Sequence, residues 1–188
     1  MGNSYFHERL GARLFRISGA SFFQVNTAQA EQVVAVVRKY LCLRNDEALL
    51  DAYCGVGTLA LSLAPLARRV VGIEESPWAV RDALANRDEN DRAEFVRGRV
   101  EQVLPDLGGS FDAILLDPPR GGCQRAALRA LAGCNASRIV YVSCDAATLA
   151  RDIAYLAPLG YNLQEVQPVD MFPQTYHIEA VALLRRGD

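Results

Sequence analysis

Apolar and polar positions in the middle of the chain follow two patterns in turn, short apolar runs and longer amphipathic stretches. Short apolar runs predict buried strands, and recurrence every three or four residues predicts helices. Strands are expected at 48–52, 70–74, 93–97, 111–116 and 138–142. Helices are expected at 58–66, from Ser76 onward, at 101–104, at 124–131 and at 146–156. Strands and helices that alternate in this way predict a doubly wound α/β sheet.

Both ends of the chain depart from this alternation. Residues 13–18 alternate as a strand does, and residues 27–41 have the spacing of an amphipathic helix with Thr27 as its N-cap. Two further strands are expected near 163–169 and 178–184. The sequence therefore adds a strand and a helix before the alternating part, and a pair of strands after it.

A glycine-containing loop follows the first strand of the alternating part. The apolar run ends at Asp51, the chain turns through Gly55 and Gly57, and a helical pattern begins at Thr58. Glycine tolerates positive φ and close approach of a ligand, and the free N–H groups at a helix start favour polar or anionic groups. The next apolar run ends at Glu74, where a carboxylate can bind both hydroxyls of a ribose. The pair of motifs predicts a nucleotide site, and its spacing leaves NAD as an alternative ligand.

Two more polar side chains follow apolar runs further along the chain. Asp117 ends the fourth predicted strand and begins a loop that two prolines stiffen. A simple turn at the end of a strand is the alternative interpretation of this loop. Cys144 ends the fifth predicted strand. Because open α/β sheets bind ligands beyond the carboxyl ends of their strands, we expect both side chains at the same edge as Asp51 and Glu74.

Cys144 and Glu179 are the residues best suited to catalysis. Cys144 precedes a predicted helix, whose N-terminus would lower the pKa of the thiol and favour the nucleophilic thiolate. A cysteine in such a place is otherwise a small buried hydrophobe. Glu179 interrupts an apolar strand, where burial would raise the pKa of the carboxyl group and make it a better base. The polar face of an edge strand is the alternative for Glu179.

Composition and charge exclude several classes of protein. The 188 residues are 51% hydrophobic and 22% charged, which suits one globular domain, and no apolar run is long enough to span a membrane. The start of the chain lacks the pattern of a signal peptide, so we expect a cytoplasmic protein. The five cysteines form no Cys-x-x-Cys pair, so we expect no metal site. A net charge of −2 is not that of a strong nucleic-acid binder.

Together these motifs resemble the RNA uracil-5-methyltransferases, which make 5-methyluridine in tRNA and ribosomal RNA. The resemblance runs from about Phe15 to Arg185 and rests on five motifs in the same order. They are Phe22–Asn26, Asp51–Gly57, Asp117–Arg120, Val142–Asp145 and Phe172–Glu179. The resemblance implies the Rossmann-like fold of class I S-adenosylmethionine-dependent methyltransferases, with S-adenosylmethionine as cofactor and RNA as substrate.

The resemblance also implies a role for individual residues. Cys144 would be the nucleophile and Glu179 the general base. The residues assigned to the methyl donor are Gln24, Tyr53, Gly55, Gly57, Thr58, Glu74 and Asp117. Carbon 5 of uracil is too poor a nucleophile to be methylated unaided, so a thiolate would add at carbon 6 and a base would later remove the proton at carbon 5.

Similar proteins usually carry an N-terminal RNA-binding barrel and a central domain as well. We therefore interpret residues 1–22 as a leading segment that resembles the tail of that central domain, and residues 23–188 as the catalytic domain. A monomer that binds the methyl donor, but binds RNA only weakly, is expected. The alternatives are a methyltransferase acting on cytosine or on an amino group, an inactive cofactor-binding module, and an NAD-dependent oxidoreductase.

Overall fold

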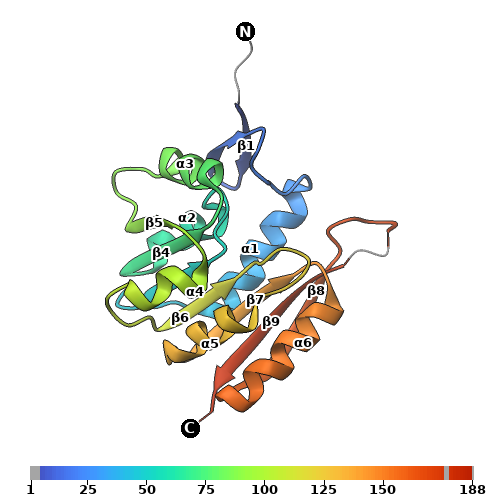
Figure 1. Ribbon diagram of the computed structural model, residues 1–188. Coiled ribbons are helices and arrows are strands. Elements are labelled where there is room, and N and C mark those ends of the chain that lie inside the picture. Colours follow the sequence, from blue (N-terminus) through green and yellow to red (C-terminus); the bar gives the residue numbers. More distant parts are fainter. Residues whose placement is uncertain (1–4, 176–177, 188) are drawn as a thin grey trace.

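A single seven-stranded sheet forms the centre of the computed structural model, which describes residues 5–175 and 178–187 (Figure 1). The strands are β3 (Ala48–Ala52), β4 (Arg69–Glu74), β5 (Ala93–Arg97), β6 (Ala113–Leu116), β7 (Arg138–Ser143), β8 (Tyr161–Val169) and β9 (Glu179–Arg186). Their order in the sheet is β5-β4-β3-β6-β7-β9-β8. β3 to β7 are parallel, and β9 is antiparallel to both of its neighbours. The predicted doubly wound α/β sheet is confirmed.

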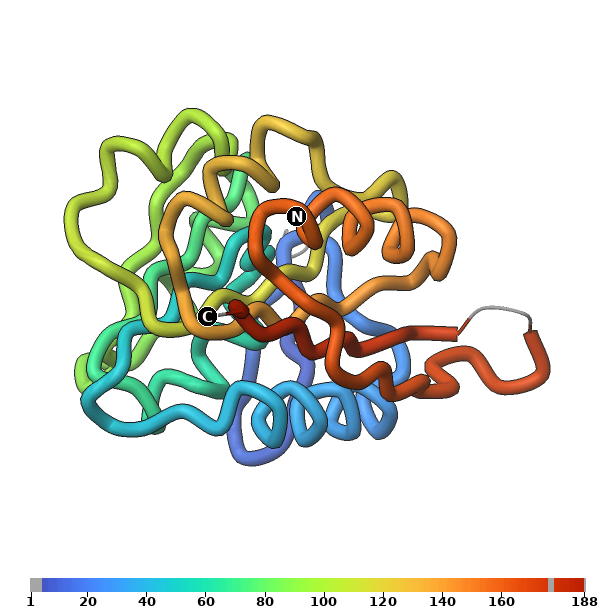
Figure 2. The backbone as a smooth tube through the Cα atoms, turned by 90° about the horizontal axis from the view of Figure 1, so that it is seen from below, coloured from blue at the N-terminus to red at the C-terminus, as the bar shows by residue number. Residues whose placement is uncertain are grey.

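Helices cover both faces of this sheet. They are α1 (Thr27–Leu41), α2 (Thr58–Leu63), α3 (Pro77–Asn86), α4 (Val100–Val103), α5 (Arg125–Gly133) and α6 (Ala146–Leu156). Figure 2 shows α1 on one side of the sheet and α6 on the other. One apolar cluster joins α1 and α2 to the sheet, and a second joins α4, α5 and α6 to the opposite face. Strands buried on both faces need apolar residues on both faces, which explains the continuous apolar runs in the sequence.

A two-stranded hairpin lies outside the sheet. β1 (Tyr5–Leu10) pairs antiparallel with β2 (Arg13–Ser18), and the hairpin packs against α3 (Figure 1). The sequence pattern predicted β2 but not β1. Phe6 and His7 of β1 are both exposed, so this strand has no alternation of buried and exposed positions for the sequence to show.

The predicted elements are present, with local differences at their ends. The N-cap of α1 is Asn26 instead of Thr27, because the Asn26 side chain accepts a hydrogen bond from the N–H of Gln29 at 3.2 Å. The helix expected over 58–66 ends at Leu63 and continues as a 3₁₀ turn that contains a proline. The remaining helix and strand boundaries coincide with the predicted ones or shift by one or two residues.

A buried ion pair joins the segment before β3 to the start of β7. Glu47 and Arg138 are 5% and 7% exposed, and their side chains approach to 2.6 Å between Oε2 and Nη2. Arg138 also donates to the carbonyl of Leu41, and the N–H of Arg44 donates to the Glu47 carboxylate at 2.9 Å. The pair thus fixes the end of the sheet opposite the site described below.

Replacing Glu47 by Gln should lower the free energy of unfolding at neutral pH by about 3 kcal/mol, because Arg138 would stay buried without its counter-charge. Burial alone would raise the pKa of Glu47, but the hydrogen bonds from Arg138 and Arg44 and their positive charges together outweigh it and lower the pKa below the ordinary 4.5. The stabilisation is therefore present above pH 4.5 and is lost as the pH falls through the folded-state pKa.

Urea unfolding of the parent and Glu47→Gln proteins at neutral and acidic pH measures this difference. Glu94→Gln is the matched control, because Glu94 forms a solvent-exposed pair with Arg69 at 3.1 Å and its loss should cost less than about 1 kcal/mol. Equal losses in the two variants would contradict the prediction.

Candidate active site

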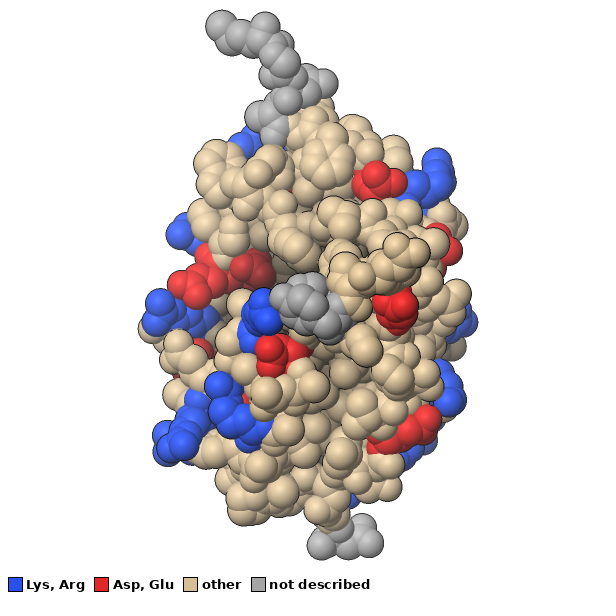
Figure 3. Space-filling view, turned by 90° about the vertical axis from the view of Figure 1, so that its right-hand side faces the viewer, with Lys and Arg blue, Asp and Glu red and all other residues tan. Residues whose placement is uncertain are grey.

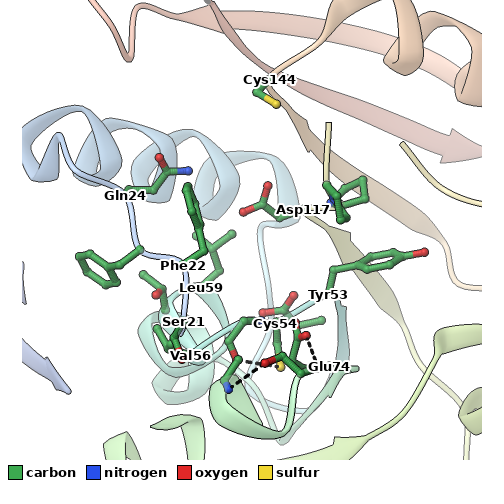
Figure 4. Close-up of a pocket in the computed structure, with 18 of the residues that line it drawn as sticks. Ser21, Phe22, Gln24, Tyr53, Cys54, Val56, Leu59, Glu74, Asp117 and Cys144 are labelled. Carbon is green, nitrogen blue, oxygen red and sulfur yellow. Dashed lines mark hydrogen bonds between the residues drawn. The ribbon is translucent and has the colours of Figure 1, made fainter. Parts of the chain in front are cut away.

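A cavity of about 960 Å³ opens at the carboxyl ends of the parallel strands (Figure 4). Most of the residues predicted for the site line it together, although they come from segments far apart in the sequence. They are Gln24, Tyr53, Gly55, Thr58, Glu74, Asp117, Cys144 and Glu179. The cavity is therefore built where the topology of the sheet predicts a ligand.

Gly57 is the one predicted site residue that does not line the cavity. It is the N-cap of α2 and has a φ of 84°, which favours glycine. A Cβ at this position would lie 2.9 Å from the ring of Phe95. Gly57 is therefore required by the turn and by close packing beneath the loop.

The carboxylate of Glu74 is fixed at the end of β4. Oε2 accepts a hydrogen bond from the N–H of Gly55 at 3.1 Å, and Oε1 accepts one from the N–H of Ser76 at 2.7 Å (Figure 4). Each oxygen keeps a lone pair for a second donor. The arrangement leaves Glu74 able to accept hydrogen bonds from a hydroxyl-bearing ligand.

Asp51 lines the same cavity and was not among the residues assigned to the methyl donor. It is 1% exposed, and neither carboxylate oxygen has a hydrogen-bond partner in the described part of the chain. Burial raises the pKa of Asp51 well above its ordinary value, and the charge of Asp117 adds to this. A buried carboxylate without a partner is costly, so the cavity favours a ligand that brings a donor or a positive charge. The signal was present in the sequence, as an acid directly before the glycine loop.

Cys144 and Glu179 face each other across two neighbouring strands. Ser143 of β7 pairs with Ala180 of β9, so the antiparallel register continues with Cys144 opposite Glu179. Glu179 is 4% exposed, and its burial raises the pKa of the carboxyl group, as predicted. β9 lies between β7 and β8, so the alternative that Glu179 belongs to an edge strand is wrong.

The expected low pKa of the Cys144 thiol is wrong. Burial, followed by the charge of Glu179, raises the pKa of this thiol. The N–H groups at the start of α6 do not offset the increase, because Asp145 is the N-cap and its Oδ1 accepts from Ala147 and Thr148 at 3.0 and 2.9 Å. The thiol therefore depends on other groups for its activation.

The proline loop that follows Asp117 is held against α6 through Arg120. The hydroxyl of Thr148 donates to the carbonyl of Arg120 at 3.1 Å, and Arg120 Nε lies 3.5 Å from Asp145 Oδ2. Burial raises the pKa of Asp117 to about 7, and the charge of Glu179 contributes.

His177, which belongs to the last predicted motif, lies outside the described residues.

Comparison with known proteins first defines the class. Residues 49–137 match the family profile named Methyltransferase domain. The fold is shared with magnesium protoporphyrin IX methyltransferase from Synechocystis, with a TM-score of 0.68 at 20% identity over 90% of this chain and 87% of that one. The chain thus has the Rossmann-like fold of S-adenosylmethionine-dependent methyltransferases.

Closer relatives define the family. Residues 108–187 match the tRNA (uracil-5-)-methyltransferase profile. An uncharacterised RNA methyltransferase of Thermosynechococcus vestitus is 46% identical over 97% of this chain and 41% of its own length. The tRNA (uracil-54, C5)-methyltransferase of Pyrococcus abyssi, solved in complex with S-adenosyl-L-homocysteine, is 35% identical over 98% of this chain and 45% of its own, with a TM-score of 0.81.

Along almost its whole length the chain is similar to RNA methyltransferases, a tRNA (uracil-54, C5)-methyltransferase among them, as its motifs predicted. It spans about two-fifths of the length of the curated relatives it matches, which is 41% and 42% of the first two. None of the helices in the described ranges is long and apolar enough to cross a membrane.

Replacing Glu179 by Gln should increase the rate at which iodoacetamide alkylates Cys144, because removing the neighbouring negative charge lowers the pKa of the thiol. Mass spectrometry of digested protein measures the rate for each cysteine at one fixed, mildly alkaline pH. The exposed Cys42 is an internal reference whose rate should not change. A Cys144 rate that stays the same or decreases relative to Cys42 would contradict the electrostatic coupling.

Proposed function

We propose that this chain is the catalytic domain of an enzyme that transfers a methyl group from S-adenosylmethionine to carbon 5 of a uridine in RNA. One observation carries the proposal. The register of β7 and β9 puts a thiol and a carboxylate opposite each other, and both line the cavity that also contains Asp51, Glu74 and Asp117. A methyltransferase acting on an amino group needs no such thiol.

The lining of the cavity fits this cofactor. Glu74 would bind the ribose hydroxyls, and the unpaired Asp51 and the half-buried Asp117 favour the positively charged part of the molecule. Gln24, Tyr53 and the glycine loop would complete the contacts, as the resemblance implies. When bound, S-adenosylmethionine supplies the electrophilic methyl group that carbon 5 of the uracil receives.

The thiolate of Cys144 begins the reaction in this scheme. Its sulfur forms a bond to carbon 6 of the uracil, and the electron pair of the double bond between carbons 5 and 6 moves toward the carbonyl at carbon 4. The resulting enolate makes carbon 5 nucleophilic. Because the pKa of the Cys144 thiol is raised, the thiol must lose its proton as the substrate binds. Arg120, whose positive charge lowers that pKa, is one group that assists.

Glu179 ends the reaction. After methylation, carbon 5 carries one hydrogen too many, and the Glu179 carboxylate removes it as a proton. The electron pair of that C–H bond restores the double bond between carbons 5 and 6, and the bond between Cys144 and carbon 6 breaks with the thiolate as leaving group. Burial raises the pKa of Glu179, which makes it a stronger base than an exposed carboxylate.

The RNA would be bound through an unstacked nucleotide, since a uracil within a helix cannot reach a thiol inside the cavity. On the face shown in Figure 3, Lys and Arg side chains lie mostly toward the margins, with acidic side chains among them. With a net charge of −2, this chain should bind RNA weakly, and other parts of the longer enzymes would add affinity. The name of the Pyrococcus abyssi relative points to tRNA, and ribosomal RNA is the other candidate.

A short RNA hairpin with 5-fluorouridine in its loop should form a methylated covalent adduct with the protein in the presence of S-adenosylmethionine. Fluorine at carbon 5 blocks the final removal of a proton, so the bond to Cys144 persists. Mass spectrometry of the intact complex and of its peptides detects the adduct. Cys144→Ser should form none, and Glu179→Gln should accumulate the adduct with ordinary uridine.

Each failure of this experiment has a separate meaning. Methylation without an adduct, retained in Cys144→Ser, would identify an enzyme acting on an amino group and overturn the proposal. No methylation despite confirmed binding of the donor would identify a cofactor-binding module that is inactive by itself.

Binding of S-adenosylmethionine should become stronger as the pH rises through about 7. The pKa of Asp117 is raised to about 7, and only its ionised form attracts a positively charged ligand. Below this pKa the ionised fraction falls by up to tenfold per pH unit, so the affinity should fall by up to about tenfold per unit. Isothermal titration calorimetry across this range measures the effect, and Asp117→Asn should flatten it. A pH profile that is identical in the variant would exclude Asp117 as the source.

A further inference from the structure

Two buried polar residues of α3 connect the N-terminal hairpin to the wall of the cavity. Asp82 and Asn86 lie one helical turn apart, so they project from the same face of the helix. They are 0% and 7% exposed. Neither lines the cavity, and neither was singled out by the sequence motifs.

Asp82 holds the segment that leads from β2 into the cavity wall. Its Oδ2 accepts from the N–H of Ser18 at 2.7 Å and from the hydroxyl of Ser21 at 2.8 Å. Its Oδ1 accepts from the hydroxyl of Ser18 at 2.8 Å, and Arg16 Nε lies 3.7 Å away. Ser21 and the three residues after it line the cavity, so the position of this wall depends on Asp82 (Figure 4).

Asn86 makes contacts in two directions. Toward the hairpin, its Oδ1 accepts from the N–H of Arg16 at 2.6 Å and its Nδ2 donates to the carbonyl of Arg16 at 3.0 Å. Toward the cavity, the same Nδ2 donates to the carbonyl of Val56 at 3.1 Å, in the middle of the glycine loop. One amide group thus fixes the hairpin and the glycine loop relative to each other.

The first turn of α3 holds a third part of the same wall. Its N-cap, Ser76, donates its N–H to the Glu74 carboxylate at 2.7 Å. Three segments of the cavity wall are therefore attached to one helix. They are the segment around Ser21, the loop at Val56 and the end of β4 at Glu74.

We propose that Asp82 and Asn86 are positioning residues for the cofactor. Through these two residues, the N-terminal hairpin helps to fix the walls of the cofactor pocket. This inference rests on the proposed function for the identity of the ligand. An isolated two-stranded hairpin is at best marginally stable, so the hairpin needs α3 to hold its conformation. Conversely, the wall at Ser21 and the loop at Val56 are both hydrogen-bonded to α3, which gives them a common reference.

The test is calorimetric titration of the parent protein and of Asn86→Asp with S-adenosylhomocysteine. Aspartate has the shape of asparagine and keeps the oxygen that accepts from Arg16, but it removes both donated hydrogen bonds. We expect the dissociation constant to rise about tenfold or more. Ser21→Ala removes one hydrogen bond at the wall and should raise the dissociation constant less. This variant replaces Asn86→Asp in the test if Asn86→Asp does not fold.

Asp91→Asn is the matched control. Asp91 forms a double hydrogen bond with Arg13 at 2.7 and 2.8 Å, which also ties the hairpin to the segment after α3 but does not reach the cavity. Its loss should lower stability while leaving the dissociation constant unchanged. Trp78, the one tryptophan, lies in the first turn of α3. Unfolding curves recorded by its fluorescence measure how much stability each variant has lost, so that binding can be compared between variants of similar stability.

A positioning role also predicts which kinetic constant changes. In a methyl-transfer assay the KM for the donor should rise in Asn86→Asp with kcat nearly unchanged, whereas loss of folded protein would lower the apparent kcat. Unchanged cofactor affinity in both Asn86→Asp and Ser21→Ala would overturn the inference, as would an equal loss in Asp91→Asn. No binding of S-adenosylhomocysteine to the parent protein would instead contradict the proposed function.

Discussion

The parallel strands of the sheet all end at one edge, and the polar chemistry of this molecule depends on that constraint. Both faces of the sheet are covered by helices, so a polar side chain at the middle of a strand would be buried without a partner. At the carboxyl ends the strands give way to loops, and a cavity can form there. Asp51, Glu74, Asp117 and Cys144 all occupy such ends, and the ligand that joins them must fit between the loops.

The gathering of acids at this edge has an electrostatic cost that the fold itself does not offset. Asp51 has no hydrogen-bond partner in the described ranges, and the pKa values of Asp51, Asp117 and Glu179 are all raised by burial. Within the described ranges, the buried carboxylate paired with a buried arginine is Glu47, which lies at the other end of the sheet and has a lowered pKa. The carboxylate with a buried counter-charge thus lies at one end of the strands, and carboxylates without one lie at the other, where a ligand can satisfy them.

The sequence predicted the sheet and most of the cavity because both depend on local patterns. Asp51, Glu74 and Asp117 each end an apolar run, and the rule for open sheets brings them together. Glu179 was singled out as a carboxylate in an apolar strand, but only the resemblance assigned it to the reaction of Cys144. Its place beside Cys144 depends on β9 entering the sheet between β7 and β8, which is a non-local pairing. The pKa of Cys144 was predicted in the wrong direction because the capping role of Asp145 and the approach of Glu179 are tertiary features. Asn86 gave no signal at all, as a polar residue near the end of a helix is ordinary in a sequence.

The position of β9 also determines the order in which the fold can be completed. β8 is made before β9 but joins the sheet only through it, and the open side of β7 stays unpaired until residues 179–186 are available. During synthesis, the growing chain therefore passes through a stage in which a long apolar strand has an exposed edge, a state prone to association with other chains. The same residues bring Glu179 opposite Cys144. The pairing of β9 with β7 therefore completes the sheet and brings the thiol and the carboxylate together in a single folding event.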